Sequence, residues 1–317
     1  MPFSETSMLY VLLGVVIGLL LPNQSAINNR LRASVSTPWV MSVISFLVGT
    51  ACLCILTWVT VGTVTFDADL LGSEPWWLWT GGLLGVVGMT TTVVLLPIIG
   101  ALYSTALNLT AQVMTTMIID HFGFFGVDMY PASPWRLGGA VLVVAAALLA
   151  VTAGRANPHL DQPSPSPAWY LVGLGIGVCF GLQVVINGQL ASELGSAIHA
   201  ALVSFAVGTI ALFVLVAVTR SSLRIRVPSG QRKNPWWMWT GGLLGALYVA
   251  GVAFLAPIIG SALTVVVIQL GLLAGSMAVD HFGLLSAPKK SVRPLQVIGL
   301  MLMGCGVFIM NAPQILA

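Results

Sequence analysis

The chain has 317 residues, of which 57% are hydrophobic and 7% are charged, with a formal net charge of +3. A soluble domain of this size would need about a quarter of its residues charged to cover its surface. The composition therefore excludes an ordinary soluble enzyme or binding domain. A mean hydropathy of +0.99 indicates a chain that lies mostly in a membrane.

Apolar stretches of about 18 to 24 residues recur along the chain, the length that a helix needs to cross about 30 Å of hydrocarbon. They are apolar on every side, whereas the strands of a membrane barrel would be shorter and would alternate apolar with polar residues. We predict an all-α integral membrane protein with ten transmembrane helices. The predicted spans are residues 8–29, 38–61, 76–97, 101–119, 135–153, 168–189, 197–218, 236–257, 261–279 and 295–312.

Neither a cleaved leader nor a cysteine site is expected. The N-terminal residues up to Ser7 include Glu5 but no Lys or Arg, so they lack the basic region of a signal peptide and the first span is predicted to remain. The cysteines, all within predicted spans, are Cys52, Cys54, Cys179 and Cys305. Cysteine in such a setting behaves as a small apolar residue, so we expect no metal site and no cofactor.

The chain repeats itself on either side of a Pro- and Ser-rich stretch. That stretch cannot continue a helix and is interpreted as a cytoplasmic linker at residues 155–167, between a first repeat at 1–154 and a second at 168–317. Three motifs recur with an offset of 160 residues, namely Pro75-Trp-Trp-Leu-Trp-Thr-Gly-Gly-Leu-Leu-Gly85 as 235–245 with Met238 in place of Leu78, Pro97-Ile-Ile-Gly100 as 257–260, and Asp120-His-Phe-Gly123 as 280–283. We expect tight turns at the second motif, because proline and glycine favour them.

Each repeat holds five predicted spans, and this odd number has a geometric consequence. The second repeat must begin on the opposite side of the membrane from the first, so equivalent helices run antiparallel. We therefore predict two inverted-topology repeats of five helices. This arrangement is common among secondary transporters.

Basic residues in the loops predict the orientation. One side receives Arg30, Arg32, Arg155, Arg220, Arg224, Arg226, Arg232, Lys233, Lys289, Lys290 and Arg293, and the other receives Arg136. The positive-inside rule makes the first side cytoplasmic, so both termini are predicted to lie outside the cytoplasm. The basic cluster at 220–233 is interpreted as a topology signal beside anionic lipid headgroups, and no nucleic-acid binding is expected.

Four short patterns resemble those of a known family. They are the Gln-x-x-x-Asn that ends the first span of each repeat, the Ser-Phe-x-x-Gly-Thr of the second, the Trp-rich opening of the third and the Asp-His-Phe-Gly that closes the fourth. Together they resemble the YdcZ-like family of the drug/metabolite transporter superfamily over nearly the whole chain. The resemblance implies a multi-pass exporter of small molecules in the bacterial plasma (inner) membrane, in a fused ten-helix form. The chain departs from the family pattern where Leu272 takes the place corresponding to Gln112, with Gln269 one turn earlier.

Carboxamides inside the predicted spans are the candidate site residues. Gln24 and Asn28 are four residues apart and share a helix face, and the second repeat keeps this spacing with one more pair, Gln183 and Asn187. An amide without a partner in hydrocarbon costs several kcal/mol, so we expect all four to face the bundle interior. Two interpretations remain open: they line a substrate pathway, or they tie helices together through hydrogen bonds.

Gln112 and Gln269 lie near mid-membrane in the fourth and ninth predicted spans. A mid-membrane amide needs a partner or water. As for the other four amides, the functional interpretation is that both line the substrate pathway, and the alternative is that they hold helices together.

The repeated titratable residues are Asp120, His121, Asp280 and His281. The odd number of spans places the two pairs at opposite faces of the membrane, about a bilayer thickness apart, so they are not expected to form one active site. Each motif is interpreted as the end of a helix with glycine as its cap. The alternative is a gate or proton relay that changes charge as the protein alternates.

The middle of every predicted span lacks Asp, Glu, Lys, Arg and His. A charge-free polar interior suits a neutral, zwitterionic or amphipathic molecule. The main hypothesis is a secondary transporter that works by alternating access as a monomer or homodimer in the lipid bilayer. The resemblance to exporters implies that it moves its substrate outward. A lipid flippase and a non-transporting scaffold are the alternatives. A membrane enzyme is least favoured, because no catalytic residues converge on one face.

Overall fold

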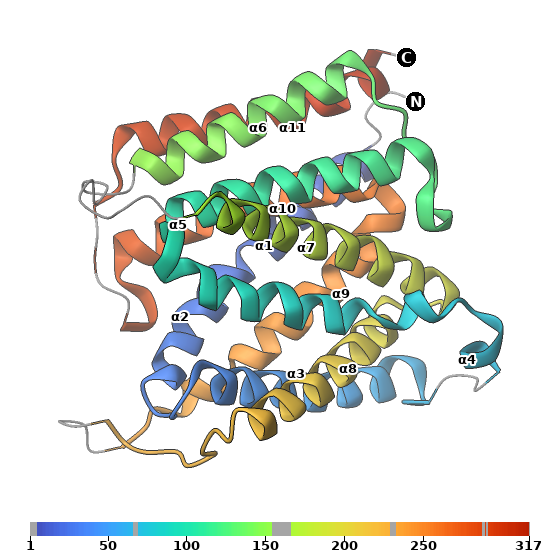
Figure 1. The fold of residues 1–317 in the computed structure, drawn as a ribbon. Helices are drawn as coiled ribbons and strands as arrows, with labels where there is room; N and C mark the ends of the chain where they lie inside the picture. The colour runs from blue at the N-terminus through green and yellow to red at the C-terminus, as the bar shows by residue number, and fades with distance from the viewer. Residues whose placement is uncertain are drawn as a thin grey trace.

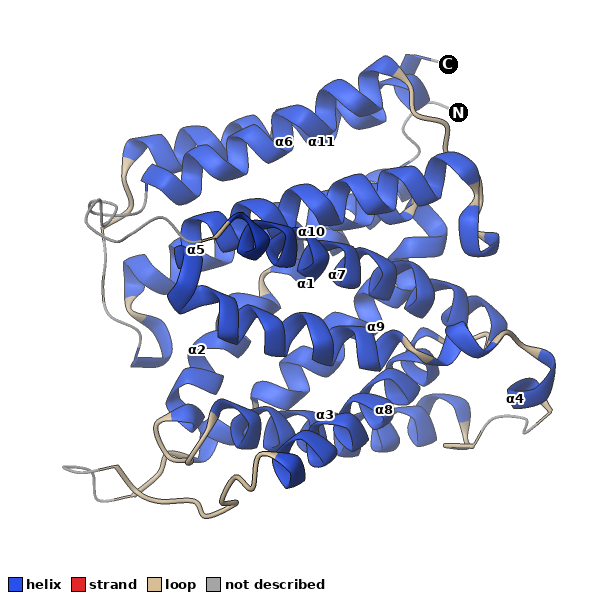
Figure 2. Ribbon diagram, in the orientation of Figure 1, coloured by secondary structure: helices blue, strands red, loops and turns tan. Residues whose placement is uncertain are grey.

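The computed structural model describes residues 5–65, 69–153, 166–228, 233–286, 289 and 291–316. Throughout these ranges the regular structure is helical, without strands (Figure 2). The predicted linker lies outside the described residues except for its last two positions.

The chain forms long helices joined by short turns. In chain order they are α1 (Glu5–Gly18), α2 (Leu20–Arg32), α3 (Pro38–Val61), α4 (Leu70–Ser73), η1 (Trp76–Trp79), α5 (Gly81–Phe122), η2 (Phe124–Gly126), α6 (Pro134–Ala153), α7 (Pro167–Glu193), α8 (Ala197–Val218), η3 (Trp236–Trp239), α9 (Gly241–Ile259), α10 (Ser261–Phe282), η4 (Leu284–Ser286) and α11 (Pro294–Leu316). In the described part of the chain, seven helical spans are long and apolar enough to cross a membrane, and two shorter apolar stretches accompany them at Gly81–Leu95 and Pro294–Met310. The predicted bounds 38–61 and 197–218 agree with α3 and α8.

The first predicted span is broken near its middle. α1 ends at Gly18 and α2 begins at Leu20, and Pro22 lies buried in the first turn of α2. Proline has no N–H to bond the carbonyl four residues earlier, which here belongs to Gly18. The break therefore falls one turn before the proline, where that missing bond predicts it.

The two Pro-Ile-Ile-Gly motifs form junctions that differ from the predicted tight turns. Pro97 and Pro257 lie inside helices, and a single glycine interrupts the helical backbone at each motif: Gly100 (φ 76°, ψ 161°) and Gly260 (φ 82°, ψ 151°). Only glycine adopts this backbone region without strain. The prediction of a four-residue turn was wrong because one glycine is sufficient to redirect the chain.

Equivalent helices of the two repeats lie side by side. α6 packs along α11 and α3 along α8, and in each pair the two helices run in opposite directions (Figure 1). The α6–α11 pair forms a layer of its own at one edge of the bundle, and the α3–α8 pair forms the opposite edge. α1 begins, and α5 and α11 end, at the same end of the bundle, which we call the terminal end; the opposite end, where α6 ends and α7 begins, is the linker end (Figure 1).

The repeats meet through residues that match each other. The Thr50 and Thr209 hydroxyl oxygens lie 3.0 Å apart, and the rings of Phe46 and Phe205 stack with centroids 4.7 Å apart. Both pairs join positions separated by 159 residues, so each residue contacts its own counterpart. Contacts of this kind lie on the axis that relates the two repeats.

Glycines allow the repeats to approach closely. A Cβ atom added at Gly82 would lie 1.9 Å from the carbonyl oxygen of Ser204, and one added at Gly242 would lie 2.0 Å from that of Ser45. Small residues at such crossings let helix backbones touch, which is a main source of helix association in membranes. The Gly-Gly pairs after the tryptophan motifs therefore act in packing, and each pair contacts the backbone of the opposite repeat.

Candidate functional site

A pocket of about 250 Å³ lies between the repeats at the terminal end. Its first-repeat lining is Asp120, Gly126, Val127, Asp128 and Tyr130, and its second-repeat lining is Gln189, Ser192, Glu193, Ala256, Pro257, Gly260 and Ser261. The walls are thus the end of α5, the following loop, the end of α7 and the α9–α10 junction. Three of the lining residues carry carboxyl groups, so the pocket is acidic and polar.

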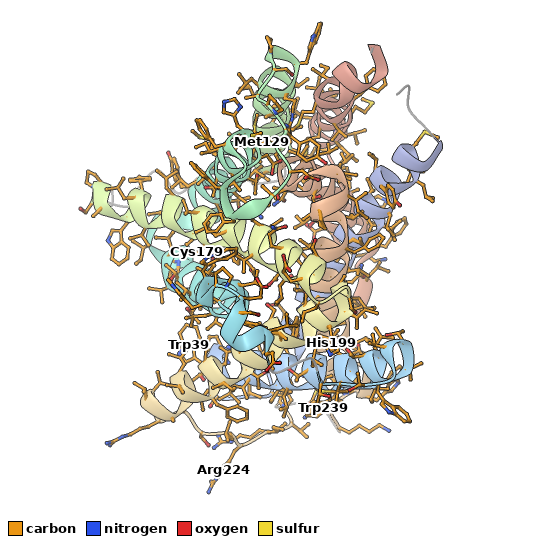
Figure 3. All side chains as sticks on the ribbon, turned by 90° about the vertical axis from the view of Figure 1, so that its right-hand side faces the viewer. Trp39, Met129, Cys179, His199, Arg224 and Trp239 are labelled. Atoms are coloured by element: carbon orange, nitrogen blue, oxygen red, sulfur yellow. The ribbon has the colours of Figure 1, made fainter. Side chains whose placement is uncertain are left out.

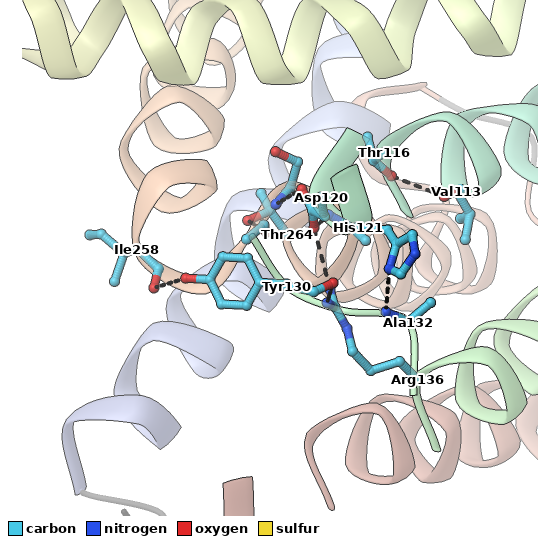
Figure 4. A network of polar contacts seen from close by, with 12 residues as sticks. Val113, Thr116, Asp120, His121, Tyr130, Ala132, Arg136, Ile258 and Thr264 are labelled. Atoms are coloured by element: carbon cyan, nitrogen blue, oxygen red, sulfur yellow. Dashed lines mark hydrogen bonds and ion pairs between the residues drawn. The ribbon is translucent and has the colours of Figure 1, made fainter. Parts of the chain in front are cut away.

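Asp120 joins the two repeats at the floor of this pocket. Its side chain is 1% exposed, and its two carboxylate oxygens accept the backbone N–H groups of Ser261, at 3.2 Å, and Ala262, at 2.9 Å (Figure 4). These N–H groups belong to the first turn of α10, where a helix has unpaired donors and a positive end. A carboxylate from the first repeat therefore caps a helix of the second.

Arg136 completes the network. Its guanidinium lies 3.3 Å from the Asp120 carboxylate, donates to the Tyr130 carbonyl oxygen and stands 5.4 Å from the centre of the Tyr130 ring (Figure 4). The Tyr130 N–H in turn donates to the Asp120 carbonyl at 2.7 Å. The beginning of α6 is thereby linked to the end of α5 and, through Asp120, to the beginning of α10.

Tyr130 offers a phenol at the wall of the pocket. Burial raises the pKa of this phenol, and the nearby carboxylates of Asp128 and Asp120 raise it further, because an anion beside them is unfavourable. The phenol stays protonated at physiological pH. Its O–H points to the carbonyl of Ile258 at a long 3.5 Å.

His121 points away from Asp120, as adjacent residues on a helix do. Its ring is exposed, and Nδ1 accepts the backbone N–H of Ala132 at 3.0 Å. The helix ends as predicted one residue later, with Gly123 as a left-handed cap at φ 66°. Asp120 and His121 therefore share a motif but not a site.

The second copy of the motif lies at the linker end. Asp280 is half-buried, His281 is exposed, and α10 ends with Gly283 at φ 64°. Gln296 occupies the position that corresponds to Arg136, and its side-chain oxygen accepts the N–H of Arg293 at 2.9 Å. The two predicted pairs are thus at opposite ends of the bundle, as the sequence predicts.

Gln112 and Gln269 meet each other across the repeat boundary. The amide of Gln269 on α10 donates to the side-chain oxygen of Gln112 on α5 at 3.4 Å. Gln112 is buried and Gln269 is half-buried. The structure thus brings the two mid-membrane amides into one polar contact, which the sequence did not predict.

The remaining four amides each face a glycine of the opposite repeat. The contacts pair Gln24 with Gly245, Asn28 with Gly241, Gln183 with Gly85, and Asn187 with Gly81; a Cβ added at any of these glycines would lie between 2.1 and 2.5 Å from the nearest amide atom. The repeated Gln-x-x-x-Asn and Gly-x-x-x-Gly patterns are therefore two sides of one interface. These are packing contacts, and the buried side-chain oxygens of Asn28 and Asn187 make no hydrogen bond in the structure, so both interpretations of the four amides stay predictions.

Sequence reasoning missed most of the pocket. It did not select Tyr130, Gln189, Ser192 or Glu193, because these residues differ between the repeats and belong to no repeated motif. One signal was available for Arg136, which is the single basic residue on its predicted side of the membrane. Within the described residues no group of three or more His, Cys, Asp or Glu side chains is arranged to hold a metal ion.

The comparisons with known proteins agree with this architecture. The family described as "Putative inner membrane exporter, YdcZ" matches residues 9–149 and again residues 168–309. The chain belongs to this family. It carries two copies of the family domain in one polypeptide, as a fused, duplicated member of a family of drug/metabolite transporters in the inner membrane.

The wider comparisons bear on the fold alone. A solved structure described as "Crystal structure of protein" matches with a TM-score of 0.68 and 15% identity, covering 96% of this chain and 98% of the other. Among curated proteins no match was found. Membership of the family makes the chain a multi-pass inner-membrane protein and indicates transport rather than an enzymatic reaction.

Proposed function

We propose that the chain is a secondary transporter that exports small neutral, zwitterionic or amphipathic molecules by alternating access. The observation that carries the proposal is the polar pocket between the repeats at the terminal end, below which the Gln112 and Gln269 amides meet inside a bundle without mid-span charges. Transporters of this kind bind substrate at the interface of their repeats. Gln112 and Gln269 are assigned to the pathway and share one polar contact that a substrate can replace.

The proposal includes a topology of ten spans in two inverted repeats. The two arms of α5, separated at Gly100, count as two crossings, and the antiparallel α6–α11 and α3–α8 pairs support the inversion (Figure 1). The terminal end is assigned to the outside, because the basic loop residues gather at the linker end. A reporter fused after Ala317 is expected to be active on the periplasmic side, and cytoplasmic activity would reject this orientation.

The remaining site residues take different places in the mechanism. Asp120 is proposed as part of an outer gate, since its bonds to the start of α10 join the two repeats beside the pocket, and Arg136 of its own repeat pairs with it there. Asp280 is its inner counterpart. His121 and His281 are exposed and adjoin these gates. Gln24, Asn28, Gln183 and Asn187 border the pathway as contacts between the rocking halves.

The pathway is tested by comparing the metabolites that accumulate outside cells with and without the protein. Wild-type protein is expected to raise the external level of at least one small molecule. Gln112→Leu combined with Gln269→Leu removes both amides at similar volume, and we expect export to fall at least tenfold, since about 1.4 kcal/mol of lost interaction corresponds to a factor of ten.

Gln296→Leu is the matched control, because that glutamine lies at the linker end and bonds its own loop. It is expected to export normally at equal membrane abundance. Undiminished export by the double variant would remove the two amides from the pathway. Equal external metabolites with and without the wild-type chain would reject transport itself.

A further inference from the structure

The connection from α8 to η3 contains a short non-helical segment in which aliphatic and basic residues alternate, and its hydrogen bonds at Ser222 and Arg226 are those of an extended chain. Residues 222–227 read Ser-Leu-Arg-Ile-Arg-Val and have no helical structure. Successive side chains of an extended chain point to opposite sides. Leu223, Ile225 and Val227 therefore share one side, and Arg224 and Arg226 share the other; we call residues 222–227 the amphipathic segment.

Hydrogen bonds hold this segment extended against the turn that follows α2. The Arg226 N–H donates to the carbonyl of Ser34 at 2.8 Å, and the Asn234 amide donates to the Arg226 carbonyl at 3.2 Å. The Ser36 hydroxyl donates to the carbonyl of Ser222 at 2.5 Å. Both ends of the segment are thus fixed to the body of the protein, which keeps the alternation of its side chains in place.

The described part of the chain covers only about half of the apolar side. Leu223 is 54% exposed, Ile225 46% and Val227 47%. The segment lies at the linker end, and in the view turned by 90° Arg224 extends beyond the outline of the helices (Figure 3). The segment lies at the periphery of the bundle, where a membrane protein meets lipid. There, three exposed aliphatic side chains can contact acyl chains while two arginines contact the headgroups.

We propose that the amphipathic segment is a binding site for anionic phospholipid, with Leu223, Ile225 and Val227 among the acyl chains and Arg224 and Arg226 on the headgroup phosphates. Guanidinium groups bind phosphate in a bidentate manner, and basic residues beside a membrane are attracted to its anionic lipids. The apolar side distinguishes this occupant from a nucleic acid, which offers nothing for three aliphatic side chains to enter. The proposal does not depend on transport.

The test measures lipid binding to the full-length protein in nonionic detergent by native mass spectrometry, with phosphatidylglycerol and phosphatidylcholine titrated separately. Wild-type protein is expected to bind phosphatidylglycerol more tightly. In Arg224→Gln combined with Arg226→Gln we expect about 30-fold weaker phosphatidylglycerol binding, about fivefold for each arginine, and little change for phosphatidylcholine. Ile225→Ser, which keeps the charge, is expected to weaken the binding of both lipids.

A second double variant, Lys289→Gln with Arg293→Gln, removes the same charge at the same end and is the matched control. It is expected to bind phosphatidylglycerol within about threefold of the wild type, less than the fivefold expected for one arginine. An equal loss in the control, equal affinity of the wild type for the two lipids, or an unchanged Ile225→Ser variant would each overturn the proposal. So would binding of an RNA oligonucleotide that disappears in the arginine variant. Equal unfolding midpoints establish that all variants are folded.

Discussion

The two ends of the bundle carry the same backbone with different side chains. Three positive-φ positions repeat closely, as Gly100 and Gly260 at 76° and 82°, Gly123 and Gly283 at 66° and 64°, and Phe125 and Leu285 at 63° and 53°, whereas Gly126 and Gly195 have no positive-φ counterpart. The side chains around them do not repeat: Arg136, Gln189 and Glu193 at the terminal end correspond to Gln296, Arg30 and Ser34 at the linker end.

The comparison distinguishes the backbone features that both repeats retain from the side chains that differ between them. The helix ends and the glycine junctions set the path of the chain, and any change there disturbs both repeats. The side chains that face the two openings meet different surroundings, and here one end has become acidic and the other basic. The two gates of the proposed transporter are thus alike in shape and unlike in charge.

The largest expected loss of stability concerns the glycine crossings, which the two repeats share. Gly82→Ala and Gly242→Ala each place a Cβ atom about 2 Å from a backbone oxygen of the opposite repeat, so the helices must separate. We expect each variant to lose at least ~3 kcal/mol of unfolding free energy, the upper range for overpacked sites. Thermal unfolding in detergent measures it.

Gly138→Ala and Gly304→Ala are the controls, because nothing lies within 4 Å of a Cβ added at either position. They should leave stability unchanged or raise it by about 0.5–1 kcal/mol through the better helix propensity of alanine. A large loss at Gly82 without one at Gly242 would show that the two crossings are not equivalent.

An intermediate loss of stability is expected from removing the charge of Asp120 at the terminal end, compared with that of Asp280 at the linker end. Asp120→Asn keeps a capping oxygen but removes the charge that pairs with Arg136, and we expect a loss of about 2 kcal/mol, because charge-assisted bonds in buried sites are the strong ones. Asp280→Asn is expected to lose less than about 1 kcal/mol, since asparagine has nearly the same size and no arginine corresponds to Arg136 there. Urea or thermal unfolding of both variants checks this, and equal losses would contradict it.

The smallest effect concerns Arg136 itself. Arg136→Gln makes the terminal end resemble the linker end, and we expect a loss of about 1 kcal/mol, because the Asp120 carboxylate keeps its two backbone N–H donors. In a double-mutant cycle with Asp120→Asn, the two changes should be non-additive by a similar amount. Additive losses would show that the ion pair contributes nothing beyond the separate bonds of each residue.

Part of this protein follows from its sequence alone. Span length and the absence of charge predict helices in a membrane, and the spacing of motifs predicts the duplication and the helix ends at Gly123 and Gly283, since these depend on local chemistry. The kink before Pro22 is local too, and the sequence places it to within about one turn.

Tertiary structure decided which residues meet. Nothing in either motif states that Gln24 faces Gly245, that Gln269 bonds Gln112, or that Asp120 caps α10, because each contact joins positions more than a hundred residues apart. Apolar character and helix propensity are properties of a single segment, and they are nearly uniform in a chain so apolar. The choice of partners depends on close packing between helices, and packing is a property of the assembled bundle.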